Sequence, residues 1–175
     1  MNAPPVDAGV RGTFAAMATA LHADIASLAF LLGTWRGEGT GGYPTIEPFR
    51  YREELVFEHV GDPFLLYRQE SWSPAEEPVH FERGFLRPGA EAGSLELVLA
   101  HPIGVTEVAH GTLDGTTLEL TAKAAGIARA ETGLPVEGLR RRYEVNGDEL
   151  TYQLDMATAD TPMTLHLEAS LRRAA

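Results

Sequence analysis

The feature that most constrains the fold is a series of short β-rich segments that fills the chain after Gly33. Each segment is rich in β-branched or aromatic residues, and Gly, Pro, Asn or Asp separates it from the next, as in β-sandwiches and β-barrels. Dipeptides such as Asp114-Gly115 and Asn146-Gly147 supply the positive φ angles that tight hairpins need. The ten segments are residues 33–39, 49–57, 64–72, 79–87, 95–100, 105–113, 117–124, 139–145, 149–156 and 163–171.

Consecutive strands joined by short turns favour an up-and-down arrangement, and closure of the sheet removes exposed edges. We therefore predict an all-β fold: a ten-stranded antiparallel up-and-down β-barrel with an N-terminal helix. The helix is predicted over residues 13–32, where apolar residues recur at steps of three and four, and it can be interrupted at residues 22–24. Residues 1–12 are expected to be a disordered tail and residues 13–175 the barrel domain. Because eight strands already enclose room for one small ligand, we expect the function to lie inside.

Charge and composition exclude several classes of function. The chain carries 14 Lys and Arg against 25 Asp and Glu, a net charge of −11, which argues against nucleic-acid and anionic-membrane partners. No segment approaches the roughly 20 apolar residues of a membrane span, and a signal peptide fits poorly, so a cytoplasmic location is expected. The chain has no cysteine, so histidine is the candidate ligand for any metal or haem iron.

The most distinctive motif follows the predicted helix directly. Gly33, Trp35, Gly37 and Gly39 open a glycine-rich segment that continues to residue 46. Glycine lets the backbone bend sharply and lets other groups approach it closely. The motif is therefore either a corner that helps to close the barrel or a backbone surface shaped around a ligand. It is not a phosphate-binding loop, because no Lys-Ser or Lys-Thr pair follows the glycines.

This motif, followed by Tyr-Pro-Thr-Ile at residues 43–46, resembles the opening signature of the nitrobindins. These are haem-binding β-barrels formerly described as fatty-acid-binding-protein-like. Residues 79–88, 103–108 and 162–171 resemble three further family segments in the same order, so the resemblance covers about residues 31–172. It implies ferric haem b as cofactor and haem-dependent isomerisation of peroxynitrite to nitrate, with nitric oxide binding as a related property. The implied partners are these small molecules, and a homodimer is left open.

The resemblance nominates His166 as the axial iron ligand, and hence as the metal-binding and catalytic residue. Side chains alternate along a strand, so Thr164 and His166 share one face while Leu165 and Leu167 share the other. If His166 points inward, the leucine face needs an outer cover, for which the N-terminal helix is the candidate. If the leucines point inward, His166 is exposed unless a β-bulge resets the alternation.

Other residues are assigned to the haem pocket by the same resemblance. His80 corresponds to a histidine beyond the haem that is not a ligand, and its alternative role is a hydrogen-bonded strand residue. Thr45 matches a threonine that contacts haem, or is a turn residue. Phe49 and Met156 line the pocket, or are ordinary core. His101 offers a second imidazole near the iron or caps the end of its strand, and we favour the cap.

One departure from the family concerns the haem propionates. The family commonly has a lysine near residues 133–137, whereas Lys123 is the only lysine here, so Arg129 or the arginines at 140–142 are the candidate substitutes. The alternative function is a non-catalytic carrier of an apolar ligand such as a fatty acid, with an inward arginine of that run and Tyr143 holding its carboxylate. Hydrolase chemistry is rejected because no serine lies in a nucleophile elbow.

Overall fold

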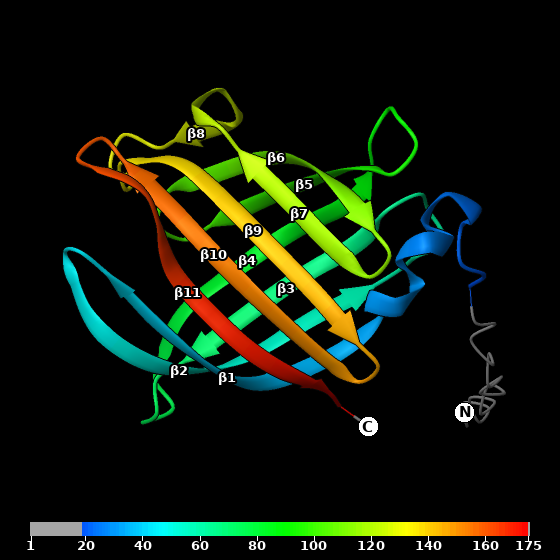
Figure 1. Ribbon diagram of the computed structural model, residues 1–175, viewed down its shortest axis with the longest axis horizontal. Helices are drawn as coiled ribbons and strands as arrows, with labels where there is room; N and C mark the ends of the chain where they lie inside the picture. Colours follow the sequence, from blue (N-terminus) through cyan, green and yellow to red (C-terminus); the bar gives the residue numbers. More distant parts are fainter. Residues whose placement is uncertain (1–18, 175) are drawn as a thin grey trace, which may run out of the picture.

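The computed structural model describes residues 19–174 and shows a closed antiparallel β-barrel with a short helix at one end (Figure 1). The predicted tail and the first part of the predicted helix, residues 13–18, lie outside the described residues. The elements are η1 Ala23–Leu31, β1 Gly33–Tyr43, β2 Ile46–Glu58, β3 Leu65–Trp72, β4 Pro78–Pro88, β5 Ser94–His101, β6 Val105–Asp114, β7 Thr117–Ala122, η2 Ala124–Gly126, β8 Ile127–Arg129, β9 Val136–Asn146, β10 Glu149–Thr158 and β11 Thr161–Arg173.

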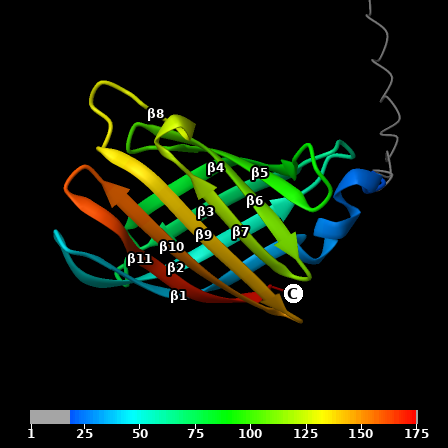
Figure 2. The same ribbon diagram turned by 45° about the horizontal axis from the view of Figure 1, so that its top comes forward.

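The strands follow the chain around the barrel almost without exception. The hydrogen-bonded order is β5-β4-β3-β2-β1-β11-β10-β9-β7-β6, and pairing of β5 with β6 closes the ring. This confirms the predicted ten-stranded up-and-down barrel (Figure 2). The sequence did not predict β8, a three-residue strand that pairs with the part of β6 beyond the end of β7. A strand this short shows no alternation that a sequence pattern could reveal.

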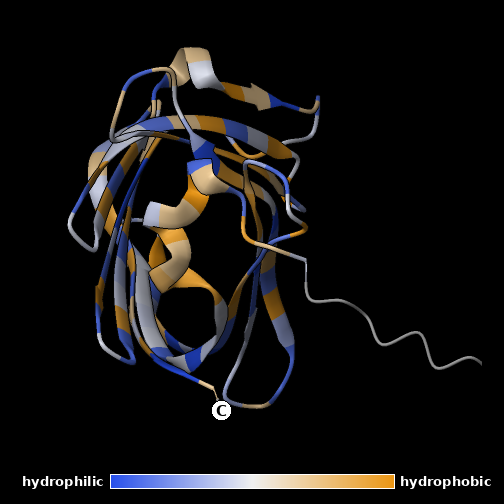
Figure 3. Ribbon diagram, turned by 90° about the vertical axis from the view of Figure 1, so that its right-hand side faces the viewer, coloured by the Kyte–Doolittle hydropathy of each residue, from blue (hydrophilic) through white to orange (hydrophobic). Residues whose placement is uncertain are grey.

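The predicted helix exists over residues 23–31 as a 3-10 helix that begins just after His22. Its buried residues Ile25, Leu28 and Leu31 recur every three positions, the period of a 3-10 helix. The helix lies across one end of the barrel (Figure 3), so the expectation that it covers an outer leucine face is wrong. No helix in the described part of the chain is long and apolar enough to cross a membrane.

Side chains from both ends of the barrel sequence hold this helix in place. The indole Nε1 of Trp35 donates to the carbonyl of Leu31 at 2.8 Å, and Arg173 donates to the carbonyl of Phe30 at 2.9 Å. The Arg173 guanidinium also lies 4.0 Å from the Trp35 ring centroid, a cation–π contact. The last carbonyls of the helix are therefore satisfied by β1 and β11, which closes this end of the barrel.

The glycine motif makes room for bulky side chains of the neighbouring strand. Gly39 pairs with Tyr51, and Gly41 pairs with Phe49. A Cβ atom at Gly39 or Gly41 would lie 2.3 Å from the Tyr51 or the Phe49 ring, respectively. The inward-facing glycines Gly39 and Gly41 thus let the side chains of β2 lie over β1.

The polarity of the side chains inside the barrel changes along the barrel axis. The part nearest the helix is apolar and contains Trp35, Leu55, Phe57, Leu65, Leu86, Leu97, Leu118, Leu150 and Leu171. The next zone carries buried polar groups, and Glu53, Gln69, Glu82, Glu107 and Arg141 are each at most 7% exposed. A cavity lies beyond this polar zone, where the hairpins β1–β2 and β10–β11 turn.

Candidate functional site

The cavity in the barrel has a volume of about 240 Å³. One wall is predominantly apolar, and the opposite side carries the polar groups of the interior. Three exposed apolar residues, Ile46, Val79 and Leu134, are among its lining residues. The remaining lining residues are Phe49, Tyr51, Glu53, Gln69, Ser71, His80, Glu82, His101, Ile103, Val105, Val136, Leu139, Arg141, Leu154, Met156, His166 and Leu167.

A β-bulge turns His166 into this cavity. Leu154 of β10 pairs with Leu167, but the next residue, Asp155, pairs with Leu165, so His166 has no partner on β10. His166 and Leu167 consequently both line the cavity, whereas Leu165 is 44% exposed. The adjacent residues His166 and Leu167 therefore both point inward, which strict alternation forbids and a bulge permits.

The orientation of the His166 ring is fixed by its neighbours. Its Nδ1 lies 3.0 Å from the carbonyl oxygen of Gly42, which can only accept, so Nδ1 carries the proton. The ring centroid lies 5.5 Å from that of Tyr43 and 6.5 Å from that of Phe49. This arrangement leaves Nε2 as the ring nitrogen for a metal, which is the usual way in which a second-shell carbonyl orients a ligating histidine.

The structure brings together most of the residues predicted to form the site. Phe49, Met156 and His80 line the cavity with His166. Thr45 is exposed in the turn between β1 and β2 and is absent from the cavity wall. His101 does not cap its strand: its side chain is 3% exposed and lies in the barrel interior beside His80.

His80 and His101 belong to a buried charged cluster. The guanidinium of Arg141 binds Glu107, and it also binds Glu82 Oε1 at 2.9 Å. His101 lies between the same carboxylates, with Nδ1 3.3 Å from Glu82 and Nε2 3.5 Å from Glu107. Burial lowers the pKa of His101, but the carboxylates of Glu107 and Glu82 outweigh burial and raise the pKa to about 9. Burial acts to raise the pKa of Glu82, yet Arg141 and the histidines lower it well below its usual value.

A second buried network surrounds Glu53. Its Oε2 lies 2.6 Å from the Tyr152 hydroxyl, which lies 2.7 Å from the Tyr51 hydroxyl and accepts from Gln69 at 3.1 Å. The network reaches the charged cluster through Tyr67, which contacts Gln69 and, at 3.4 Å, Glu82. Burial raises the pKa of Glu53 to about 8, so this group is a neutral carboxylic acid at neutral pH.

Sequence reasoning gave no role to Glu53, Glu82 or Glu107, and it considered Arg141 only as one of the three arginines at 140–142. A usable signal existed, because each is in phase with inward-facing residues of its own strand, as Glu53 is with Tyr51 and Leu55. The same alternation places the three arginines at residues 140–142 on two different faces of β9. Arg141 is 2% exposed, whereas Arg140 and Arg142 form ion pairs on the outer face with Asp155 and with Glu119 and Glu144. Two of the three arginines therefore lie on the solvated face of β9.

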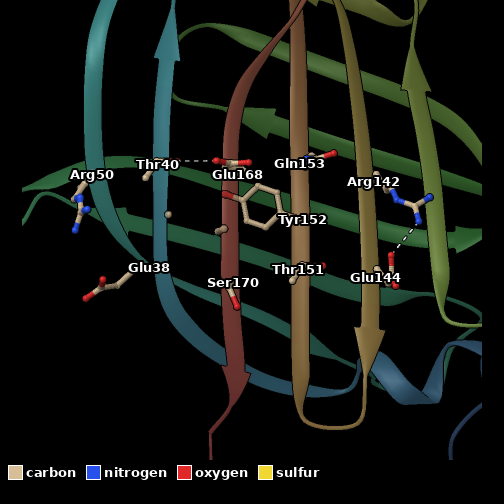
Figure 4. Close-up of a pocket in the computed structure, with 12 residues that line it drawn as sticks. Glu38, Thr40, Arg50, Arg142, Glu144, Thr151, Tyr152, Gln153, Glu168 and Ser170 are labelled. Atoms are coloured by element: carbon tan, nitrogen blue, oxygen red, sulfur yellow. Dashed lines mark hydrogen bonds and ion pairs between the residues drawn. The ribbon is translucent and has the colours of Figure 1, made fainter.

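A larger hollow, of about 570 Å³, lies on the outside of β1, β9, β10 and β11 (Figure 4). Its walls are mainly charged and small polar side chains. Thr40 donates to Glu168 at 3.3 Å, and Arg142 Nη2 lies 3.0 Å from Glu144. No histidine lines this hollow, so it offers no imidazole ligand for a haem iron.

The donor set of the interior cavity fits a haem. His166 offers one imidazole nitrogen from the wall that holds Phe49 and Met156, and apolar residues of β9 and β10 continue that wall. A single histidine with an apolar surround is a recognised haem-binding arrangement. Arg129, on β8, is exposed and pairs through its backbone with the cavity residue Val105, so it remains a candidate partner for a propionate.

Comparison with known proteins agrees with this site. A family model described as "THAP4-like, heme-binding beta-barrel domain" matches residues 24–173. Peroxynitrite isomerase 2 of Mycobacterium marinum is 47% identical over 156 residues, covering 87% of this chain and 96% of that protein. The peroxynitrite isomerase of Nocardia farcinica is 48% identical over 158 residues, covering 88% and 93%. The crystal structure of Rv2717c from M. tuberculosis has a TM-score of 0.82 and 44% identity, covering 89% of this chain and all of that one. The chain therefore belongs to the THAP4-like family of haem-binding β-barrels, the nitrobindins.

Proposed function

We propose that the chain binds haem b through Nε2 of His166 and isomerises peroxynitrite to nitrate. The observation that carries this proposal is the bulge in β11, which directs His166 into an apolar-walled cavity with its tautomer fixed by Gly42. The relatives named peroxynitrite isomerase support the choice of substrate. The reaction conserves atoms and electrons, because peroxynitrite and nitrate have the same composition and charge.

When bound, ferric haem supplies a Lewis acid that polarises the anionic substrate at its weak O–O bond. The chain's own residues perform three tasks around it. His166, hydrogen-bonded through Nδ1, keeps Nε2 deprotonated for the iron. Phe49 and Met156 exclude water, so that the fragments of the substrate stay together until they recombine. We also propose that the haem-loaded chain binds nitric oxide as a related property.

The polar side of the cavity offers one side chain that can donate a hydrogen bond to a small ligand. His80 lines the cavity, and its side chain is 25% exposed, so it can reach a small ligand there. The cluster behind it contains Arg141 and His101, which both carry positive charge, and Glu82 and Glu107, which balance them. We propose that His80 donates a hydrogen bond to the substrate and that Thr45 lies outside the catalytic contacts.

The carrier function receives no support from the arginine run. Arg141 is the only member of the run that reaches the cavity, and it is already bound to Glu82 and Glu107. A fatty acid carboxylate placed there would meet two buried carboxylates, and its negative charge would be repelled. Among the described residues, nothing else in the run faces the interior.

Reconstitution with hemin tests the proposal. The wild-type chain should shift the Soret band from that of free hemin and should raise the yield of nitrate from peroxynitrite. His166→Ala should lose both, because it removes the iron ligand while Leu167 still fills the wall. His110→Ala is the matched control, since His110 lies on the outer face and its side chain is 70% exposed. Retention of the shifted band in His166→Ala would contradict the assignment of the ligand.

The homodimer and the cytoplasmic location stay predictions. The mass of the haem-loaded chain in solution, measured by light scattering, tests the first, and fractionation of the source cell tests the second.

A further inference from the structure

A group of three ligand atoms in the interior has the dimensions of a metal site. His80 Nε2 lies 3.5 Å from Glu82 Oε1, His101 Nδ1 lies 3.3 Å from the same oxygen, and the two nitrogens lie 3.5 Å apart. The three atoms thus form a nearly equilateral triangle. We propose that His80, Glu82 and His101 bind one divalent metal ion of the zinc type, at a site separate from the haem ligand His166.

The edges of the triangle favour tetrahedral coordination. Zinc binds histidine nitrogen and carboxylate oxygen at about 2.0–2.2 Å, and a tetrahedron of that size has edges of about 3.4 Å. An octahedral ion with the same ligand distances requires edges of about 3.0 Å, which are shorter than all three observed distances. Two histidines and one glutamate are also the ligand set of catalytic zinc sites that keep a fourth position open.

The same distances are longer than those expected for the hydrogen bonds of a protonated His101. A charge-assisted N–H···O bond between an imidazolium and a carboxylate is about 2.7–2.9 Å long. His101 is buried between two carboxylates, yet both of its contacts with them are longer, and its Nε2 has no hydrogen-bond partner among the described residues. The ligand atoms are therefore spaced widely enough for a metal ion to replace the proton of His101.

The charges of the cluster leave room for a cation. Glu82 and Glu107 carry two negative charges, and Arg141 supplies one positive charge. Arg141 occupies one lone pair of Glu82 Oε1 at 2.9 Å, and a carboxylate oxygen has a second lone pair for a metal. Buried charges need compensation, so a second cation completes the cluster, and a metal ion bound to His101 can take the place of the proton that the ring holds without it.

Second-shell groups orient the proposed ligands. Glu107 Oε1 lies 3.5 Å from His101 Nε2, on the opposite side of the ring from the proposed metal. A carboxylate behind a ligating histidine is the usual device for fixing its tautomer. All three ligand residues line the cavity, so the fourth position of the metal is reachable from it by water or by a small oxyanion.

Titration of the full-length chain with Zn²⁺ in a calorimeter, after chelator treatment, tests the proposal with and without haem. We expect one Zn²⁺ per chain. His101→Gln and Glu82→Gln should weaken binding by at least about 100-fold, and Glu107→Gln by about 10- to 100-fold. His110→Gln, the same substitution on the outer face, should leave the affinity unchanged. Equal affinity in all variants, or no uptake by the wild type, would overturn the proposal.

Two further measurements guard against misfolded variants and identify the geometry. His80→Asn is the safer ligand variant, because no arginine contact of His80 is found among the described residues, and circular dichroism checks that the barrel is retained. Co²⁺ absorption in the His166→Ala chain, which lacks haem bands if our assignment of the iron ligand holds, should show the intense visible bands of a tetrahedral ion. An octahedral spectrum would overturn the site. Because His166 is not a ligand here, zinc uptake by this variant also separates the two proposals.

Discussion

The buried carboxyl of Glu53 should make the stability of the barrel depend on pH in a predictable direction. Burial raises the pKa of this group from 4.5 to about 8 in the folded chain, whereas an unfolded chain exposes it to water. Between these values the unfolded state releases a proton and the folded state keeps it. The contribution of the neutral carboxyl is therefore complete below about pH 4.5 and is lost as the pH rises through about 8.

The size of the effect follows from the shift in pKa. Each unit is worth about 1.36 kcal/mol, so the full shift corresponds to about 5 kcal/mol, of which about 3 kcal/mol is lost between pH 5 and pH 8. Glu53→Gln removes the ionisation but keeps an oxygen that can accept from Tyr152. We therefore expect the free energy of unfolding of the wild type to fall relative to that of the variant as the pH rises.

Urea unfolding of both chains at half-unit steps between pH 5 and pH 8, followed by circular dichroism, measures this difference. Glu38→Gln is the control, because Glu38 is exposed on β1 and should follow the wild type at every pH. We define the difference as the free energy of unfolding of Glu53→Gln minus that of the wild type. A difference that stays constant, or that falls as the pH rises, would refute the reasoning.

Three further predictions concern packing and charge. Gly41→Ala places a new Cβ 2.3 Å from the Phe49 ring, so it should push the ring into the cavity and weaken hemin binding in a Soret titration. Gly147→Asn is the control, because nothing lies within 4 Å of a new Cβ at the exposed Gly147 and asparagine tolerates the positive φ there. Arg141→Met should lower the free energy of unfolding in urea by about 3–5 kcal/mol because it removes the arginine partner of the buried carboxylates Glu82 and Glu107, and an unchanged free energy of unfolding would contradict the charge balance described above. Leu171→Ala should lower the free energy of unfolding by about 2–5 kcal/mol in the same assay, because Leu171 is fully buried. Leu165→Ala should lower it by less than about 1 kcal/mol, because Leu165 is 44% exposed, and equal losses would contradict the position of the bulge.

The fold was largely predictable because strand alternation and hairpin turns are local signals. All ten barrel strands were found from residue spacing, and their observed bounds differ from those predicted by at most four residues at either end. The bulge at His166 was not predictable, since its cause is a change of pairing with β10, 11 to 12 residues away in sequence, and the strand's own alternation gives no sign of it. The resemblance to a family named His166, but only the coordinates show how the histidine and the leucines of β11 share one interior.

The polar interior was missed for a related reason. Glu82 and Arg141 lie 59 residues apart in the chain, and strand alternation can place each on an inward face but cannot show that the two form an ion pair. Their role becomes visible only when the ring of strands brings β4 and β9 to face each other across the barrel. Thr45 illustrates the opposite case, in which a matched motif residue lies in an exposed turn rather than in the cavity wall.

The seam between β1 and β11 determines when during biosynthesis the barrel can form. Gly37 pairs with Leu171, so contacts that close the ring join positions 171 − 37 = 134 residues apart. Loop closure over such a distance is slow, and contacts of this kind delay folding. Until β11 pairs with β1, the sheet has two open edges and an interior that is exposed to water. Haem therefore finds its finished pocket only after this last pairing has formed.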